Sequence, residues 1–364
     1  MGHSRKNRYR EFRRRTKPGA VPGTIIKDPN AHPSSLRLMA YDQNQCKDFL
    51  DPSVSDVRKH VAAAGKAWLH VTGLADLNTI LELGSIFDLH NLALEDVVNV
   101  HQRPKVEDYD GHYFAISRYA TAELDAIHQL AIFVGPNYVL SFQETPDNVV
   151  QEIIDRLLEG KGKIRTSGSD YLAYTLLDAC VDSFFPALEK LGDDMEDLED
   201  RIVSKPDPAQ VTEIQALKHR LSYFRRSVWP MRDALSQLTR NLGGRIEVDT
   251  IPYIRDCIDH SVQLLDIIEN YREVASAMLE LYLANLNQRL NDIMRILTLI
   301  ATVFLPLSFI ASLYGMNFDR SASAWNMPEL SWRFGYVYVL LLMTATASGL
   351  LYFFRSRGWL KRRS

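Results

Sequence analysis

Cysteine is scarce in this chain of 364 residues: only Cys46, Cys180 and Cys257 occur, far apart and without a Cys-x-x-Cys pair. This excludes a disulfide framework and a thiolate zinc cluster, and it favours a reducing compartment. The net charge of −3 argues against nucleic acid as the main partner. Enzyme motifs are also lacking, because the Gly160–Lys163 segment has the wrong spacing for a phosphate-binding loop and no hydrolase pattern occurs. The sequence therefore predicts a protein that is not an enzyme.

Charged residues are absent from two long segments near the C-terminus. Residues 296–318 and 334–354 are stretches of 23 and 21 residues without a charge. A bilayer core about 30 Å thick requires about 20 apolar residues in a helix. We therefore predict two transmembrane helices, over 295–316 and 333–354. The alternative, two buried helices of a soluble core, suits shorter apolar segments.

Basic residues flank the predicted spans unevenly. Arg295 precedes the first span and five Lys or Arg lie in the tail 355–364, whereas Arg320 in the connection 317–332 stands beside acidic residues. The positive-inside rule then predicts a plasma-membrane protein with both termini in the cytosol and the connection outside. The basic arm 1–35 carries no apolar segment of the kind found in signal peptides. We interpret it as a disordered segment able to contact anionic lipid.

Two cytosolic regions precede the spans. Residues 36–145 mix helical patterns with short β-rich segments and predict an α/β domain. Those segments are 67–71, 113–117, 130–134 and 138–142. In the region 146–250 the strand pattern disappears, and helical periodicity predicts helices over 148–158, 170–203 and 209–241.

A further helix is predicted from about Pro252, with no strong breaker before Pro306. We expect a stalk over 251–294 that continues into the first span without interruption. At 1.5 Å per residue, a helix of about 62 residues would be roughly 90 Å long. Movement in the cytosolic part would then be linked mechanically to the membrane.

Small and polar residues form a stripe along the first span. At a 3,4 spacing the stripe contains Asn291, Met294, Thr298, Ala301, Leu305, Ser308, Ser312 and Gly315. Such a stripe suits either close helix packing or a water-filled lumen. A lumen would need several copies of the chain, because two helices cannot enclose one. Periodicity alone leaves both interpretations open.

The triplet Gly315-Met316-Asn317 follows this stripe at the predicted outer end of the first span. With the segments 94–105, 253–256 and 294–317, it makes the chain resemble the CorA family of magnesium transporters, whose signature is a Gly-Met-Asn triplet between two C-terminal spans. The resemblance covers most of the chain. It implies an α+β membrane protein that forms a funnel-shaped homopentamer, with a central pore lined by the first span. Methionine at position 316 favours Mg²⁺ transport over the zinc export of some relatives, and Co²⁺ and Ni²⁺ are further ions that the protein would carry.

The resemblance also assigns roles along the pore. Gly315, Met316 and Asn317 would form the selectivity filter, where five Asn317 amides face the tightly held waters of a hydrated Mg²⁺. The pore-lining residues would be Asn291, Met294, Leu297, Thr298, Leu305 and Ser308. The polar members would bond hydration water, and the apolar members would gate the pore by dewetting. The membrane potential would supply roughly 4.6 kcal/mol per divalent ion at 100 mV, so that no ATP site is required.

Regulation by cytosolic Mg²⁺ is a further implication of the resemblance. The matching positions are Glu95, Asp96 and Asp256, which would lie at a boundary between subunits. Like charges there repel unless a cation lies between them, so high Mg²⁺ would hold the pore closed. The alternative is that these acids cap helices or form surface salt bridges. Glu329 in the outer connection would attract cations.

Three further interpretations complete the prediction. The histidines, His101 among them, show no metal-ligand spacing and are interpreted as structural. The acidic segment 189–200 is interpreted as a solvated helix face, with Leu191, Met195, Leu198 and Ile202 packed on the other side. A different class of function also stays open, a membrane-anchored scaffold or sensor that conducts no ions. Such a protein would tolerate Asn317→Ala without loss of function.

Overall fold

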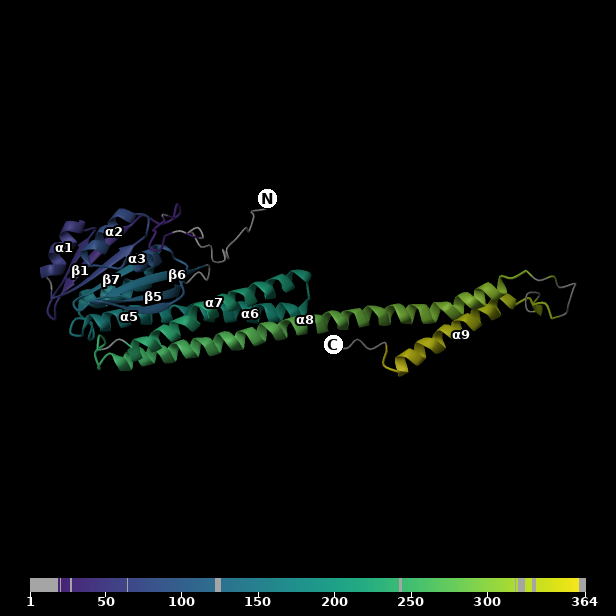
Figure 1. The fold of residues 1–364 in the computed structure, drawn as a ribbon. Helices are drawn as coiled ribbons and strands as arrows, with labels where there is room; N and C mark the ends of the chain where they lie inside the picture. Colours follow the sequence, from purple (N-terminus) through teal and green to yellow (C-terminus); the bar gives the residue numbers. More distant parts are fainter. Residues whose placement is uncertain are drawn as a thin grey trace. The chain divides into compact units, whose positions relative to one another are not determined.

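The computed structural model describes residues 19, 21–26, 28–63, 65–121, 126–241, 244–317, 319, 325–328 and 332–359. These residues divide into two compact units, 1–279 and 280–364, which are described separately. Figure 1 shows the elements of each unit. The first unit contains a mixed sheet with helices on both faces, and the second contains two long apolar helices.

The sheet has seven strands in the order β2-β1-β3-β7-β6-β5-β4. The strands are β1 (Ser35–Tyr41), β2 (Cys46–Leu50), β3 (Lys66–Thr72), β4 (Lys105–Tyr109), β5 (His112–Ala120), β6 (Ile127–Val134) and β7 (Tyr138–Gln143). All neighbours pair antiparallel except β3 and β7, which are parallel. The four predicted strands are confirmed as β3, β5, β6 and β7. The segments of β1, β2 and β4 were not predicted as strands.

One face of the sheet is covered by α1 (Val54–Ala63), α2 (Leu77–Ile86) and α3 (Asn91–Val98) (Figure 1). Their buried side chains pack with those of the central strands in one core, in which Leu69, Ile80, Leu94, Phe114 and Phe133 are at most 2% exposed. This burial places α3, with Glu95 and Asp96 on its more exposed side, in a fixed position beside the sheet.

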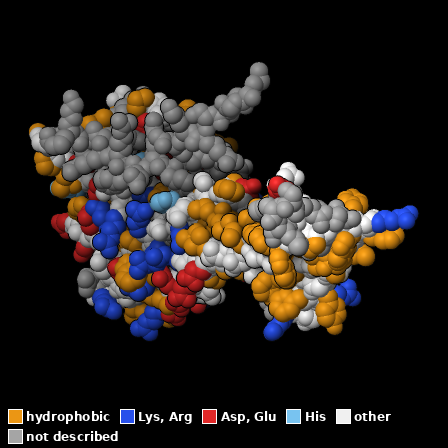
Figure 2. Space-filling view, turned by 90° about the vertical axis from the view of Figure 1, so that its right-hand side faces the viewer, with side chains coloured by type: hydrophobic (Ala, Val, Ile, Leu, Met, Phe, Trp, Pro, Cys, Tyr) orange, Lys and Arg blue, Asp and Glu red, His pale blue; other side chains and the backbone are white. Residues whose placement is uncertain are grey.

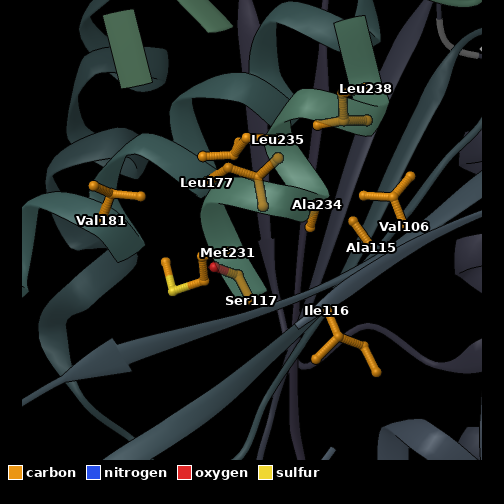
Figure 3. Close-up of a pocket in the computed structure, with 10 residues that line it drawn as sticks. All are labelled: Val106, Ala115, Ile116, Ser117, Leu177, Val181, Met231, Ala234, Leu235 and Leu238. Atoms are coloured by element: carbon orange, nitrogen blue, oxygen red, sulfur yellow. The ribbon is translucent and has the colours of Figure 1, made fainter. Parts of the chain in front are cut away.

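The opposite face packs against α5 (Ser169–Asp182) and α7 (Pro208–Asn241), which contact β4 to β7. Figure 3 shows a small cavity at this contact, with room for about one water in its volume of about 10 Å³. It is lined by Val106, Ala115, Ile116, Ser117, Leu177, Val181, Met231, Ala234, Leu235 and Leu238. The lining is apolar apart from one serine, so we interpret the cavity as a packing gap.

The predicted helix over 170–203 is wrong, because two helices occupy this segment. Helix α5 ends at Asp182, and α6 (Phe184–Ser204) begins after a turn at Ser183. Pro186 has no N–H to donate to the carbonyl of Asp182, and its ring would clash with that carbonyl in a continuous helix. The Ser183 hydroxyl stabilises the turn, since it donates to Cys180 O at 2.7 Å and accepts from Ala120 N at 2.9 Å.

The other predicted helices are present. A 3₁₀ turn (Asn148–Val150) precedes α4 (Gln151–Glu159). Helix α7 begins and ends within one residue of its predicted bounds. Helix α8 (Ile251–Tyr314) is continuous over 64 residues and contains Pro306, as expected. Helix α9 (Gly335–Ser356) follows, and both α8 and α9 contain segments long and apolar enough to cross a membrane.

Candidate cation sites

In the second unit, α9 covers one face of α8. Arg295 Nη2 donates to the carbonyl of Gly358 at 3.1 Å, so the end of α9 lies beside the first turns of the predicted span. The half-buried residues of α8 between positions 296 and 313 are Leu299, Thr302, Val303, Pro306, Leu307 and Ile310. The covered face is therefore mostly apolar, and it shares no residue with the stripe of small and polar residues.

The predicted pore-lining residues are all exposed in the single chain. These are Asn291, Met294, Leu297, Thr298, Leu305 and Ser308. The apolar members are strongly exposed, from 58% at Met294 and Leu297 to 71% at Leu305. Thr298 donates its hydroxyl to Met294 O at 2.8 Å, which leaves its oxygen lone pairs facing outward as acceptors. Large apolar side chains such as Phe304 and Phe309 are equally exposed on α8, so two chemically different surfaces flank the covered face.

The Gly-Met-Asn triplet begins directly after α8 ends at Tyr314. Gly315 N and Met316 N still donate to carbonyls of the last helical turn, at 3.0 and 3.2 Å, and Asn317 is exposed beyond them. A Cβ on Gly315 would lie 3.2 Å from Ala311 O, so the small residue lets the chain turn tightly there. Glu329, predicted to attract cations, lies outside the described residues.

Asp96 takes part in a compact charged network on the first unit. Its Oδ2 lies 2.6 Å from Lys105 Nζ, which is also 2.6 Å from Glu107 Oε1. Burial raises the pKa of Asp96 more than the Lys105 hydrogen bond lowers it. Burial also opposes the charge of Lys105, but hydrogen bonds to Asp96 and Glu107 raise the pKa of the ammonium above its ordinary value. In the single chain, Asp96 is therefore a salt-bridged acid, as the alternative interpretation expected.

Glu95, the neighbour of Asp96, contacts the N-terminal segment instead. Its Oε2 accepts a hydrogen bond from Gly23 N at 2.7 Å, across 72 residues of sequence. Gly23 has a φ of +85°, and a Cβ there would lie 3.4 Å from Asn91 Cβ. The segment around Gly23 thus lies against α3, next to the acids predicted to bind a regulatory cation.

Asp256 belongs to a second cluster, formed between α5 and α8. His260 lies one turn after Asp256 and places its Nδ1 3.3 Å from Asp182 Oδ1, with its Nε2 3.9 Å from Asp256 Oδ2. Ligand atoms of Asp178, Asp182 and His260 all lie within 4.8 Å of one another. These residues offer two carboxylates and an imidazole at a distance that one metal ion could bridge.

The second cluster is not fully satisfied by hydrogen bonds within the described residues. Asp178 Oδ2 accepts from Tyr174 Oη at 3.3 Å, but Asp178 Oδ1 is buried without a hydrogen-bond partner there, and His260 Nδ1 makes no hydrogen bond there either, although Asp182 Oδ1 lies 3.3 Å away. Burial, followed by the charge of Asp182, raises the pKa of Asp178 to about 6. Burial and the neighbouring carboxylate thus both disfavour the charged form of Asp178.

The spacing of the histidines predicts structural roles, and that prediction stays untested, but the fold places His260 beside two carboxylates that could hold a metal ion together with it. A signal was present, because Asp178/Asp182 and Asp256/His260 are each four residues apart and so lie on one face of a helix. Sequence spacing did not show that these two faces meet. The fold brings them together where α8 packs beside α5.

The acidic segment on α6 is a helix face, as predicted. Leu191, Met195, Leu198 and Ile202 are buried, and the acidic positions between them are mostly exposed. Some of these acids pair with basic residues of α7, as Asp194 does with Arg220 at 3.4 Å. Figure 2 shows charged side chains gathered on one part of the surface and hydrophobic side chains on another.

Comparisons with known proteins agree with this architecture. Residues 63–361 match the model of a family described as CorA-like Mg²⁺ transporter protein. The chain is 35% identical over 356 residues to the cobalt/magnesium transport protein CorA of Thermotoga maritima, covering 96% of this chain and 99% of that protein. It is 28% identical to the divalent cation transporter CmaX of Pseudomonas aeruginosa, over 66% of this chain and 70% of that protein.

The fold also resembles a solved structure. The complete structure of the CorA magnesium transporter from Methanocaldococcus jannaschii superposes with a TM-score of 0.74 at 24% identity, covering 90% of this chain and 98% of that one. At this identity the similarity bears on the fold alone. It extends over both the sheet-containing unit and the two apolar helices.

Proposed function

Because the chain belongs to the CorA-like Mg²⁺ transporter family, a family of transporters rather than enzymes, we propose that it carries hydrated Mg²⁺ into the cytosol. Co²⁺ and Ni²⁺ are proposed as further cargo. Relatives with this architecture are named cobalt/magnesium transport protein and divalent cation transporter. The two apolar helices fit a membrane protein. Both termini are proposed to lie in the cytosol and the connection between the helices outside.

The observation that carries this proposal is the arrangement of α8. One face is covered by α9, the stripe from Asn291 to Ser308 is left exposed, and the Gly-Met-Asn triplet follows at the helix end. We propose that five copies meet around an axis with these stripes inward, as a funnel-shaped homopentamer. The polar members would hold hydration water, and Met294, Leu297 and Leu305 would form apolar constrictions.

Asn317 is proposed as the centre of the selectivity filter, with Gly315 and Met316 positioning it. Mg²⁺ sheds its octahedral waters reluctantly, so a filter that recognises the hydrated ion avoids the cost of dehydration. A ring of neutral carboxamides attracts a divalent ion through its dipoles without the deep trap of a carboxylate ring. The membrane potential would provide the driving force.

Cytosolic divalent cations are proposed to regulate the pore at Glu95, Asp96 and Asp256. We extend this site to Asp178, Asp182 and His260, because these residues form one cluster with Asp256. Carboxylates and water suit Mg²⁺, and the imidazole of His260 adds a donor that Co²⁺ and Ni²⁺ favour. A cation bound between subunits would offset the repulsion of these acids and stabilise the closed state.

The test is Mg²⁺ flux into liposomes that contain the full chain and enclose a magnesium-sensitive dye. Wild type should give a dye response that grows with an inside-negative potential, and Asn317→Ala should lose selectivity or flux. Asn326→Ala, in the outer connection, is a matched control that should leave flux intact. The rival scaffold function would be favoured by a flat trace for wild type at low and high internal Mg²⁺.

A further inference from the structure

Lys105 is the only basic residue in its charged network among the described residues, and its ammonium lies directly against the carboxylate of Asp96. Its Nζ lies 2.6 Å from both Asp96 Oδ2 and Glu107 Oε1, so one ammonium bridges carboxylates from α3 and β4. The side chain of Lys105 is 30% exposed and that of Asp96 is 18% exposed. The ammonium is thus shielded in part from water while it offsets one of the two negative charges.

The main chain of Asp96 and the carboxylate of Glu107 make hydrogen bonds that do not depend on Lys105. Gln129, buried on β6, donates its Nε2 to the main-chain carbonyl of Asp96 at 2.9 Å. On β4, alternate residues share one face of the strand, and Tyr109 donates its hydroxyl to Glu107 Oε2 at 2.9 Å. Removal of the ammonium would therefore leave the backbone of Asp96 and the side chain of Glu107 in place, with both acids on the same part of the surface.

We propose that Lys105 is a tethered competitor of the divalent cation at Asp96 and thereby sets the cation concentration at which the regulatory site fills. The inference rests on the proposed regulatory function of Asp96. A divalent ion and an ammonium cannot both occupy the same carboxylate oxygen, so binding exchanges one cation for the other. The released lysine remains attached to its strand and returns when the divalent cation leaves.

The size of the effect follows from Coulomb's law. A unit positive charge about 4 Å from a divalent ion repels it, even in water, strongly enough to change its dissociation constant by about tenfold or more. Loss of the ammonium should accordingly lower the Mg²⁺ concentration needed for half occupancy by about tenfold or more. Without the competition, the site would fill at Mg²⁺ levels where the wild-type site stays occupied by lysine.

The first experiment measures how Mg²⁺ protects the full-length protein from protease. The midpoint of protection should fall about tenfold in Lys105→Met, which keeps the length of the side chain but removes its charge. Lys105→Arg keeps the charge and should stay near the wild-type midpoint. Lys161→Met is the matched control, because Lys161 pairs with Glu159 at 2.5 Å away from this network, and its midpoint should not move. An unchanged or higher midpoint in Lys105→Met overturns the proposal.

The second experiment needs no variant and decides the matter if Lys105→Met fails to fold. Acylation of lysines in the wild-type protein is followed by peptide mass spectrometry, with and without saturating Mg²⁺. The rate at Lys105 should rise several-fold in Mg²⁺, whereas the rate at Lys161 should stay constant. Equal rates at Lys105 in both conditions would show that no exchange occurs.

These outcomes separate the inference from the functions on which it rests. A failure of the transport proposal shows as absent flux, which neither the protection midpoint nor the acylation rate measures. A failure of the regulatory proposal shows as wild-type protein that Mg²⁺ does not protect. The exchange itself is contradicted by a wild type that Mg²⁺ protects but whose midpoint does not depend on Lys105, or whose acylation rate at Lys105 does not change with Mg²⁺.

Discussion

Replacement of Asp178 by Asn should make the folded protein more stable at neutral pH. The carboxylate of Asp178 is partly buried beside Asp182, and its pKa rises from 3.8 to about 6. A shift of about two units corresponds to about 3 kcal/mol at 1.36 kcal/mol per unit. Because Asp178 keeps some exposure to solvent, screening reduces this to about 1–2 kcal/mol. Asparagine keeps the size and the polarity of the side chain but carries no charge.

The sign of the effect fixes its pH dependence. The pKa of Asp178 is raised in the folded state, so the folded protein binds this proton more tightly than the unfolded chain does. The resulting stability is present below about pH 4 and is lost as the pH rises through about 6. The asparagine of Asp178→Asn does not titrate. The stability of this variant relative to wild type should therefore increase as the pH rises from about 4 to about 6.

The assay is thermal unfolding of the full chain in detergent at pH 4 and pH 7.5, without divalent cations. The Tm of Asp178→Asn should exceed that of wild type by a few degrees at pH 7.5, with a smaller gap at pH 4. Asp193→Asn, at an exposed position of α6, is the matched control and should show no such change with pH. Added Mg²⁺ should raise the Tm of wild type more than that of Asp178→Asn, because a ligand stabilises only the state that binds it. The reasoning is refuted if the gap is the same at both pH values.

Two further predictions concern the framework that holds these sites. Gly73→Ala should cost about 3 kcal/mol, from about 1–2 kcal/mol of left-handed backbone strain and a similar overpacking cost. The reason is that the new Cβ would lie 2.1 Å from Pro33 O at a φ of +80°. Gly111→Ala, at a φ of +83° but in open space, should cost only the strain; equal losses of Tm in both would contradict the steric argument. Arg165→Ala should lower stability by about 1–3 kcal/mol, because it removes the side-chain donors to two carbonyls at the end of α4. Arg165 donates to Leu157 O at 2.7 Å and to Leu158 O at 2.6 Å. Arg58→Ala on α1 is the comparison in the same thermal assay, and an equal Tm for both variants would contradict the capping role.

The sequence predicts the elements whose burial is complete. Strands β3, β5, β6 and β7 lie inside the sheet, and their runs of apolar residues follow from contact with helices on both faces. The missed strands β2 and β4 lie at the two edges, where half-exposed positions tolerate sequences such as Cys46–Leu50 and Lys105–Tyr109. Their strand structure depends on pairing with β1 and β5, which a local pattern does not contain.

The candidate sites show the same division between local and non-local information. The triplet at Gly315–Asn317 could be found because its residues are adjacent in sequence. The cluster of Asp178, Asp182 and His260 could not, because it depends on α5 ending at Asp182 and on α8 returning beside it. The salt bridge of Lys105 with Asp96 likewise depends on the placement of α3 next to β4. The partners of charged residues that lie several elements apart in sequence could thus be identified only from the fold.

The two parts of the proposed regulatory site differ in how their charge is balanced without a metal ion. At Asp96 the ammonium of Lys105 already offsets part of the negative charge of Asp96 and Glu107, so a divalent cation that replaces it gains only the difference between two cations. At Asp178 the second carboxylate of Asp182 adds to the negative charge, and the buried Oδ1 has no hydrogen-bond partner among the described residues. A cation that enters there relieves repulsion without having to displace another. On this reasoning the Asp178 cluster should bind Mg²⁺ at a lower concentration than Asp96 does. The exchange at Lys105 should then determine the Mg²⁺ concentration at which Asp96 binds the cation.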